Sequence, residues 1–165
     1  MVMKIKVQKM YGSLQECECC GTYSAEGIFV LADENLIWKK YSDGHMYGEQ
    51  TEESILDSIL NCWEEIQLNK INKESTEEAR IDWNVKHPGN GIARTEESWK
   101  QYNQEKVDYL KETLSRVRES CDKLPYSEVL EVKMIALWLE ECFGEEIAVS
   151  VSYISENKAE RKYVK

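Results

Sequence analysis

The segment Cys17-Glu18-Cys19-Cys20-Gly21 carries side chains that bind soft metal ions. Cys17 and Cys20 have CxxC spacing, which lets two thiolates meet one zinc ion at a tight turn, and the glycine frees the backbone there. A structural zinc site needs four ligands, and the second pair would come from Cys62, Cys121, Cys142, His45 or His87. None of these is spaced as a second zinc knuckle. The sequence therefore favours a strand with Cys17 and Cys19 on one face and Cys20 on the other, and it predicts no metal ligands.

A second segment, residues 83–94, combines groups that suit a phosphorylated or nucleotide-like ligand. Its candidate binding residues are Trp83, Lys86, His87, Asn90 and Arg94. The tryptophan can stack on a base, and backbone N–H groups of the glycines at a helix start can bind phosphate. Against this, Glu96 and Glu97 repel an anion, and neither GxxxxGK[ST] nor GxGxxG is present. The alternative is a surface loop anchored by its tryptophan.

Residues for catalysis are scarce in this chain. Its two histidines allow a Cys–His pair from Cys20 or Cys62 with His45 or His87, but no spacing brings such a pair together. The motifs GxSxG and HExxH are absent. The sequence therefore predicts no catalytic residues and no cofactor, and a Cys–His enzyme is the less favoured alternative.

The chain is strongly acidic. Its 165 residues include 21 Lys and Arg against 31 Asp and Glu, a formal net charge of −10 that excludes a generally basic nucleic-acid binder. Such a field attracts basic protein surfaces, although it also serves solubility alone. The mean hydropathy is −0.59, and no apolar run approaches the length of a membrane-spanning helix. The N-terminal MVMKIKVQKMYG lacks the apolar region of a secretory signal, so we expect a cytoplasmic protein with reduced thiols.

The first 48 residues are predicted to form an antiparallel meander. Met3, Ile5 and Val7 alternate with polar residues, which is the period of a half-buried strand. Asp43-Gly44 is a strong hairpin signal with a short return strand after it. Further strands are predicted over residues 14–23, 27–32, 36–41 and 146–154, and the last of these is expected to return to the N-terminal sheet.

Three segments carry apolar residues at helical spacing. One helix is predicted to begin after a Thr51 cap and to fade near Asn69, and a second to begin at Thr95. A third covers residues 127–143 and ends at Gly144. Because it has little polar face, this third helix is expected to be the central buried one.

The second helix carries an apolar seam over its residues 99–124. The seam steps by three and four residues through Val107, Leu110, Leu114, Val117, Cys121 and Leu124. Such a seam pairs with another helix, either the one at 127–143 or the same helix of a second copy in a homodimer. Among the tryptophans, Trp38, Trp63 and Trp138 are expected in the core and Trp99 as a hydrophobic plug.

These elements define an α+β fold. An N-terminal antiparallel β-meander and a C-terminal strand form one sheet, and three helices pack on one of its faces. One domain is predicted over residues 1–154. It contains a long irregular loop at 69–94, where no period is sustained. Residues 155–165 are polar and are expected to form a disordered tail.

Charge and the scarcity of catalytic groups together favour one function. We expect a non-enzymatic acidic binding protein, an inhibitor or immunity-type protein of the kind that phages or mobile elements encode, which blocks a basic protein partner. The alternative is a protein that binds or sequesters a small phosphorylated or nucleotide-like molecule through residues 83–94.

Overall fold

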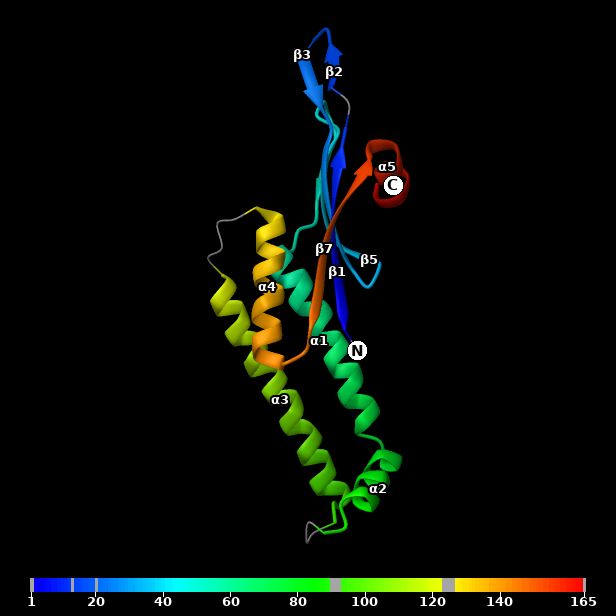
Figure 1. The fold of residues 1–165 in the computed structure, drawn as a ribbon, viewed down its shortest axis with the longest axis vertical. Coiled ribbons are helices and arrows are strands. Elements are labelled where there is room, and N and C mark those ends of the chain that lie inside the picture. Colours follow the sequence, from blue (N-terminus) through cyan, green and yellow to red (C-terminus); the bar gives the residue numbers. More distant parts are fainter. Residues whose placement is uncertain (1, 13, 20, 90–92, 123–126, 165) are drawn as a thin grey trace.

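The computed structural model describes residues 2–12, 14–19, 21–89, 93–122 and 127–164 (Figure 1). Within these ranges the chain forms a five-stranded mixed sheet, a separate two-stranded sheet and five helices. The predicted α+β class is therefore confirmed. The molecule is elongated: the two-stranded sheet lies at one end, and a helical hairpin extends past the other end of the large sheet (Figure 1).

The large sheet has the strand order β6-β5-β4-β1-β7. Its members are β1 (Met3–Tyr11), β4 (Glu26–Ala32), β5 (Asn35–Ser42), β6 (Gly48–Gln50) and β7 (Ile147–Ser155). The first four pair antiparallel in the predicted meander, and β7 pairs parallel to β1. The predicted return of the last strand to the N-terminal sheet is confirmed. A parallel pair needs a long crossover, and four helices supply it here.

The predicted single strand over residues 14–23 is wrong. Strand β2 (Leu14–Cys17) turns back into β3 (Gly21–Ser24), and the two pair only with each other. Gly21, opposite Cys17 in the register, has φ +83°, which is the left-handed conformation that glycine adopts at least cost. The cysteine motif therefore lies at the tip of a hairpin and not within one continuous strand.

The described residues form five helices, most of which begin at a capping side chain. They are α1 (Ile55–Glu74), α2 (Glu77–Lys86), α3 (Glu96–Cys121), α4 (Glu128–Phe143) and α5 (Glu156–Tyr163). Thr95 caps α3 and Gly144 ends α4, as predicted, and the structure adds Ser127 as the N-cap of α4. Helix α1 begins later than predicted, because Ser54 caps it while the Thr51 hydroxyl accepts the backbone N–H of Lys39 at 2.9 Å.

The irregular loop predicted at residues 69–94 is largely helical. Helix α1 continues to Glu74, and α2 follows after a cap at Thr76. No residue of α2 is buried, so its sequence shows no apolar period. Its helix instead begins on a capping hydroxyl and two acidic residues in the first turn.

The predicted arrangement of three helices on one face is correct only in part. Apolar residues of α1, α3 and α4 share one core with β1, β4, β5 and β7 on one face of the sheet. The opposite face has its own core, which α5 covers with Ala159 and Tyr163. Residues 156–163 are therefore an ordered helix, and the predicted disordered tail is wrong. Helix α2 lies at the far end of the α1–α3 pair (Figure 1).

The seam on α3 is buried within the chain. Leu110, Leu114, Val117 and Cys121 join the core that α1 and α4 also form, and Leu124 lies outside the described residues. This is the intrachain pairing that the sequence left open beside a homodimer. No described helix combines the length and the apolar composition that crossing a lipid bilayer requires.

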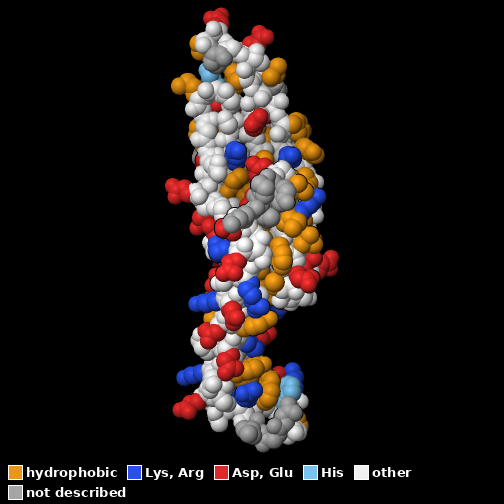
Figure 2. Space-filling view, turned by 90° about the vertical axis from the view of Figure 1, so that its left-hand side faces the viewer, with side chains coloured by type: hydrophobic (Ala, Val, Ile, Leu, Met, Phe, Trp, Pro, Cys, Tyr) orange, Lys and Arg blue, Asp and Glu red, His pale blue; other side chains and the backbone are white. Residues whose placement is uncertain are grey.

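Helix α4 is not the fully buried helix that its composition predicted. Val132, Ile135 and Leu139 are buried, whereas Leu137 and Trp138 on the other side are exposed. Figure 2 shows apolar side chains gathered on the surface of one side of the molecule, over its middle. The core positions predicted for Trp38 and Trp63 are confirmed, Trp99 is buried as expected of a hydrophobic plug, and the core position predicted for Trp138 is wrong.

Candidate functional site

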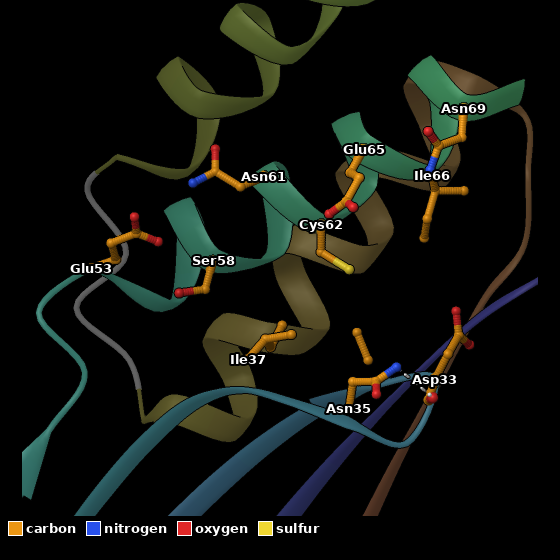
Figure 3. Close-up of a pocket in the computed structure, with 11 residues that line it drawn as sticks. Asp33, Asn35, Ile37, Glu53, Ser58, Asn61, Cys62, Glu65, Ile66 and Asn69 are labelled. Atoms are coloured by element: carbon orange, nitrogen blue, oxygen red, sulfur yellow. Dashed lines mark hydrogen bonds between the residues drawn. The ribbon is translucent and has the colours of Figure 1, made fainter. Parts of the chain in front are cut away.

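An open pocket of about 490 Å³ lies between α1 and the turn that joins β4 to β5 (Figure 3). Helix α1 lines it with residues that repeat at steps of three and four, the spacing of one helix face: Ser58, Cys62, Glu65 and Asn69. Figure 3 shows Ser58 and Cys62 extending toward the sheet, with Asp33 and Asn35 opposite them on the turn. The pocket volume falls within the range of small-ligand sites.

The β4–β5 turn is held in an uncommon conformation. Asp33 (φ 47°) and Glu34 (φ 69°) both adopt left-handed backbone angles without being glycine. Two hydrogen bonds to Lys4 fix the turn: its N–H donates to Asp33 Oδ1 at 3.0 Å, and its carbonyl accepts the Asp33 N–H at 2.9 Å. Lys6 donates to the Glu34 carboxylate at 2.9 Å, which lowers the pKa of that carboxyl group. The turn therefore presents Asp33 and Asn35 to the pocket in a fixed position.

The lining of this pocket is acidic. Three carboxylates (Asp33, Glu53 and Glu65) and three amides (Asn35, Asn61 and Asn69) contribute to its lining, all of them exposed, and no Lys or Arg is among the described residues that line it. Among the described residues, none of the three carboxylates forms an ion pair, although eight ion pairs occur elsewhere. We refer to this site as the acidic pocket.

Ser58 adds a second polar feature to the acidic pocket. It is 6% exposed, and its Oγ has no hydrogen-bond partner among the described atoms. An unpaired buried hydroxyl costs about 1–3 kcal/mol of desolvation. A donor that enters the pocket and bonds to this oxygen would recover that free energy.

Cys62 lies in the same pocket but is poorly suited to nucleophilic catalysis. Burial raises the pKa of its thiol, and the nearby Asp33 and Glu65 carboxylates raise it further, so the thiolate is disfavoured at neutral pH. Neither His45 nor His87 is among the described residues that line the pocket. The Cys62–His pair considered from the sequence is therefore not assembled here, and Cys20, the other candidate, lies outside the described residues.

The structure brings three of the five residues predicted in segment 83–94 into one aromatic cluster. Trp83 stacks on His87, with ring centroids 4.3 Å apart, and the Arg94 guanidinium lies 5.3 Å from the Trp83 ring. The fourth, Lys86, pairs with Asp82 at 2.8 Å. Asn90 lies outside the described residues. The segment joins α2 to α3, and its cations lie against aromatic rings or carboxylates.

The cavity beside Trp83 is small, and the positive charges of its lysines are already paired with carboxylates. Its volume is about 250 Å³, below the 300–1,000 Å³ typical of ligand sites. Its two lysines both have acidic partners, Asp82 for Lys86 and Glu74 for Lys106. Asn84 further closes the turn, because it exchanges hydrogen bonds of 3.1 and 2.8 Å with the backbone of Arg94. These contacts favour the interpretation of this segment as an anchored turn.

Sequence reasoning missed a basic groove of about 510 Å³ between β1, β7 and α5. Its lining includes Lys158, Arg161 and Lys162 on one face of α5 and the exposed Tyr11 and Tyr153, and none of the described residues that line it is Asp or Glu. The lysines and arginine recur at the i, i+3, i+4 spacing of a helix. This spacing is visible in the sequence, but the polar composition of residues 155–165 predicts a tail and not a helix.

Comparisons of the chain with protein-family models, with curated proteins and with solved structures gave no significant match. The features that bear on function are therefore the acidic pocket, the basic groove and the chemistry of their residues.

Proposed function

We propose that this chain is a non-catalytic binding protein that blocks a basic protein partner by taking a Lys or Arg side chain of that partner into the acidic pocket. The observation that carries the proposal is a pocket lined by three carboxylates and by no basic residue. The net charge of −10 supports it at longer range, because a negative field steers a basic partner toward the surface.

The chemistry of the acidic pocket fits a guanidinium group best. Arginine presents five N–H donors and no acceptor, so it needs several oxygen acceptors at once. The carboxylates of Glu53 and Glu65, the amide oxygen of Asn61 and the unpaired Ser58 hydroxyl supply acceptors of this kind. Ile37 and Ile66 provide apolar surface for the methylene stem.

A labelled arginine-rich peptide tests the proposal. We expect the E53Q/E65Q variant to bind it at least about tenfold more weakly than the wild type, because two of the three charges that face the cation are lost. The measurement is fluorescence anisotropy at two salt concentrations, with a peptide that carries citrulline in place of arginine as the ligand control. Affinity for the arginine peptide should fall as salt rises.

The matched control removes the same charge elsewhere. The E112Q/E119Q variant neutralises two exposed carboxylates of α3, outside the acidic pocket. It should retain most of the wild-type affinity. Equal losses in the two variants, or equal binding of the citrulline peptide, would show that the pocket does not recognise the cation.

A second candidate function is the binding or sequestering of a small phosphorylated ligand, now at the basic groove and not at residues 83–94. The observation that favours it is the group of three cations with no acidic residue in the lining. Tyr11 and Tyr153 are exposed there and offer surfaces on which a base can stack.

Calorimetric titration with ATP and with inorganic pyrophosphate tests whether such a ligand binds at the basic groove or at residues 83–94. The K158Q/R161Q variant should lose at least about tenfold in affinity, because two charge-assisted contacts to phosphate oxygens disappear. The K86Q/R94Q variant should bind as the wild type does. The opposite ranking would return the site to residues 83–94, and no heat of binding with either ligand would rule out this function.

A further inference from the structure

Two segments that are distant in sequence bring three metal-binding side chains together at the hairpin end of the molecule. Cys17 and Cys19 come from the tip of the β2–β3 hairpin, and His45 comes from the turn between β5 and β6. Cys17 Sγ lies 3.0 Å from Cys19 Sγ and 3.5 Å from His45 Nε2. One ligand atom from each residue lies within 4.8 Å of the other two.

These separations are close to those of a tetrahedral zinc site. With Zn–S bonds of about 2.3 Å and Zn–N bonds of about 2.0–2.1 Å, two ligand sulfurs lie about 3.8 Å apart, and a sulfur and a nitrogen about 3.5 Å apart. The Cys17–His45 separation already matches. The two sulfurs need to move apart by less than about 1 Å. Rotation of the Cys19 side chain at an exposed turn can supply that movement.

His45 is held in place by its own turn. Asp43 Oδ1 accepts the backbone N–H groups of His45, Met46 and Tyr47 at 2.8 to 3.0 Å. Gly44 has φ +78°, and a Cβ at this position would lie 2.2 Å from the carbonyl oxygen of Ser24, so the turn packs directly on β3. The imidazole needs no backbone movement to face Cys17.

The hairpin contributes the opposite side of the site. Tyr23 on β3 stacks on the His45 ring, with centroids 5.0 Å apart, and its hydroxyl donates to Gln15 on β2 at 3.0 Å. A single aromatic side chain thus links both strands of the hairpin to the histidine. This stacking restricts rotation of the His45 ring.

We propose that Cys17, Cys19 and His45 bind a zinc ion, which joins the β2–β3 hairpin to the β5–β6 turn. Two thiolates and one imidazole are ligands that select zinc over magnesium or calcium. Three protein ligands leave one position of a tetrahedral ion for water or another donor. The proposed ligand set differs from the CxxC pairing considered from the sequence because it includes Cys19 and His45, whereas Cys20 lies outside the described residues.

Zinc binding to the reduced full-length protein tests this proposal. The probe is Zn²⁺ itself, measured by competition with a chromophoric chelator, and Co²⁺ serves as a spectroscopic substitute. We expect one ion per chain, thiolate-to-cobalt charge-transfer absorption, and a rise in melting temperature on addition of Zn²⁺. The variants C17S, C19S and H45N should each lose about 100-fold or more in affinity for Zn²⁺.

Two control variants keep the test specific. C142S removes a cysteine of α4, and H87N removes the other histidine; both should bind one Zn²⁺ with wild-type affinity. Circular dichroism of each metal-free variant checks that the fold is retained, so that a loss of binding reports the ligand. Wild-type affinity in H45N, equal losses in H45N and H87N, or no binding by the reduced wild type would overturn the proposal.

Discussion

Replacing Trp63 by Ala is expected to lower the free energy of unfolding by about 4 kcal/mol. The side chain is 1% exposed on α1 and meets the Phe143 ring edge-on, with centroids 5.4 Å apart. Its removal leaves a cavity where α1 and α4 meet over the sheet. Since domains of this size are commonly stable by 5–15 kcal/mol, the loss is a large part of the total. Urea denaturation followed by circular dichroism measures it.

Trp138 is the matched control for this prediction. It also lies on a helix and was also expected in the core, but it is 37% exposed. Trp138→Ala should therefore cost about 1 kcal/mol or less. The Trp63→Phe variant should cost less than the alanine variant, because the phenyl ring fills much of the cavity that alanine leaves empty. Equal costs for Trp63→Ala and Trp138→Ala would show that α4 is not packed with this side toward solvent.

The contrast between the two tryptophans shows what helical periodicity can predict. Helix α1 alternates apolar and polar residues, so its buried face, including Ile59 and Trp63, could be identified from spacing alone. Helix α4 is apolar on both sides, and the pattern cannot say which side meets the sheet. Only packing against β7 and α3 decides that Leu139 is buried and Trp138 is not.

Elements with strong local signals were predictable, and elements stabilised by distant contacts were not. Thr95, Ser127 and Gly144 mark helix ends through interactions within a few residues, so the sequence located α3 and α4 well. Helix α5 has only two buried residues, and both contact strands far away in sequence. A polar sequence with so few apolar residues gave no local reason to expect order.

The candidate sites, like helix α5, depend on contacts between residues that are distant in sequence. The acidic pocket joins Asp33 on a turn to Glu65 on a helix, and His45 meets Cys17 across a separation of 28 residues. Both depend on how the strands pair and not on a local motif. The sequence did name Cys17 and His45 as possible zinc ligands, because cysteine and histidine are recognisable by type alone. What it lacked was the pairing that brings them together.

Tyr163→Ala is expected to destabilise the protein by about 3 kcal/mol, although the residue lies in a segment that reads as a polar tail. Its ring is 8% exposed and stacks on the fully buried Phe29, with centroids 4.6 Å apart. Its hydroxyl hydrogen-bonds to Gln8, and its carbonyl accepts the Lys39 ammonium at 2.9 Å. Removal of the ring exposes the second core of the sheet to water.

The control for this prediction is Tyr109→Ala on α3, where the ring is 57% exposed and alanine suits a helix. It should change the free energy of unfolding by no more than about 0.5 kcal/mol. Urea denaturation measures both variants. Hydrogen exchange supplies a second readout, because loosening α5 should increase exchange in β4 and β1 beneath it before the helices of the opposite face are affected. A Tyr163→Ala protein as stable as Tyr109→Ala would mean that α5 does not hold this face of the sheet.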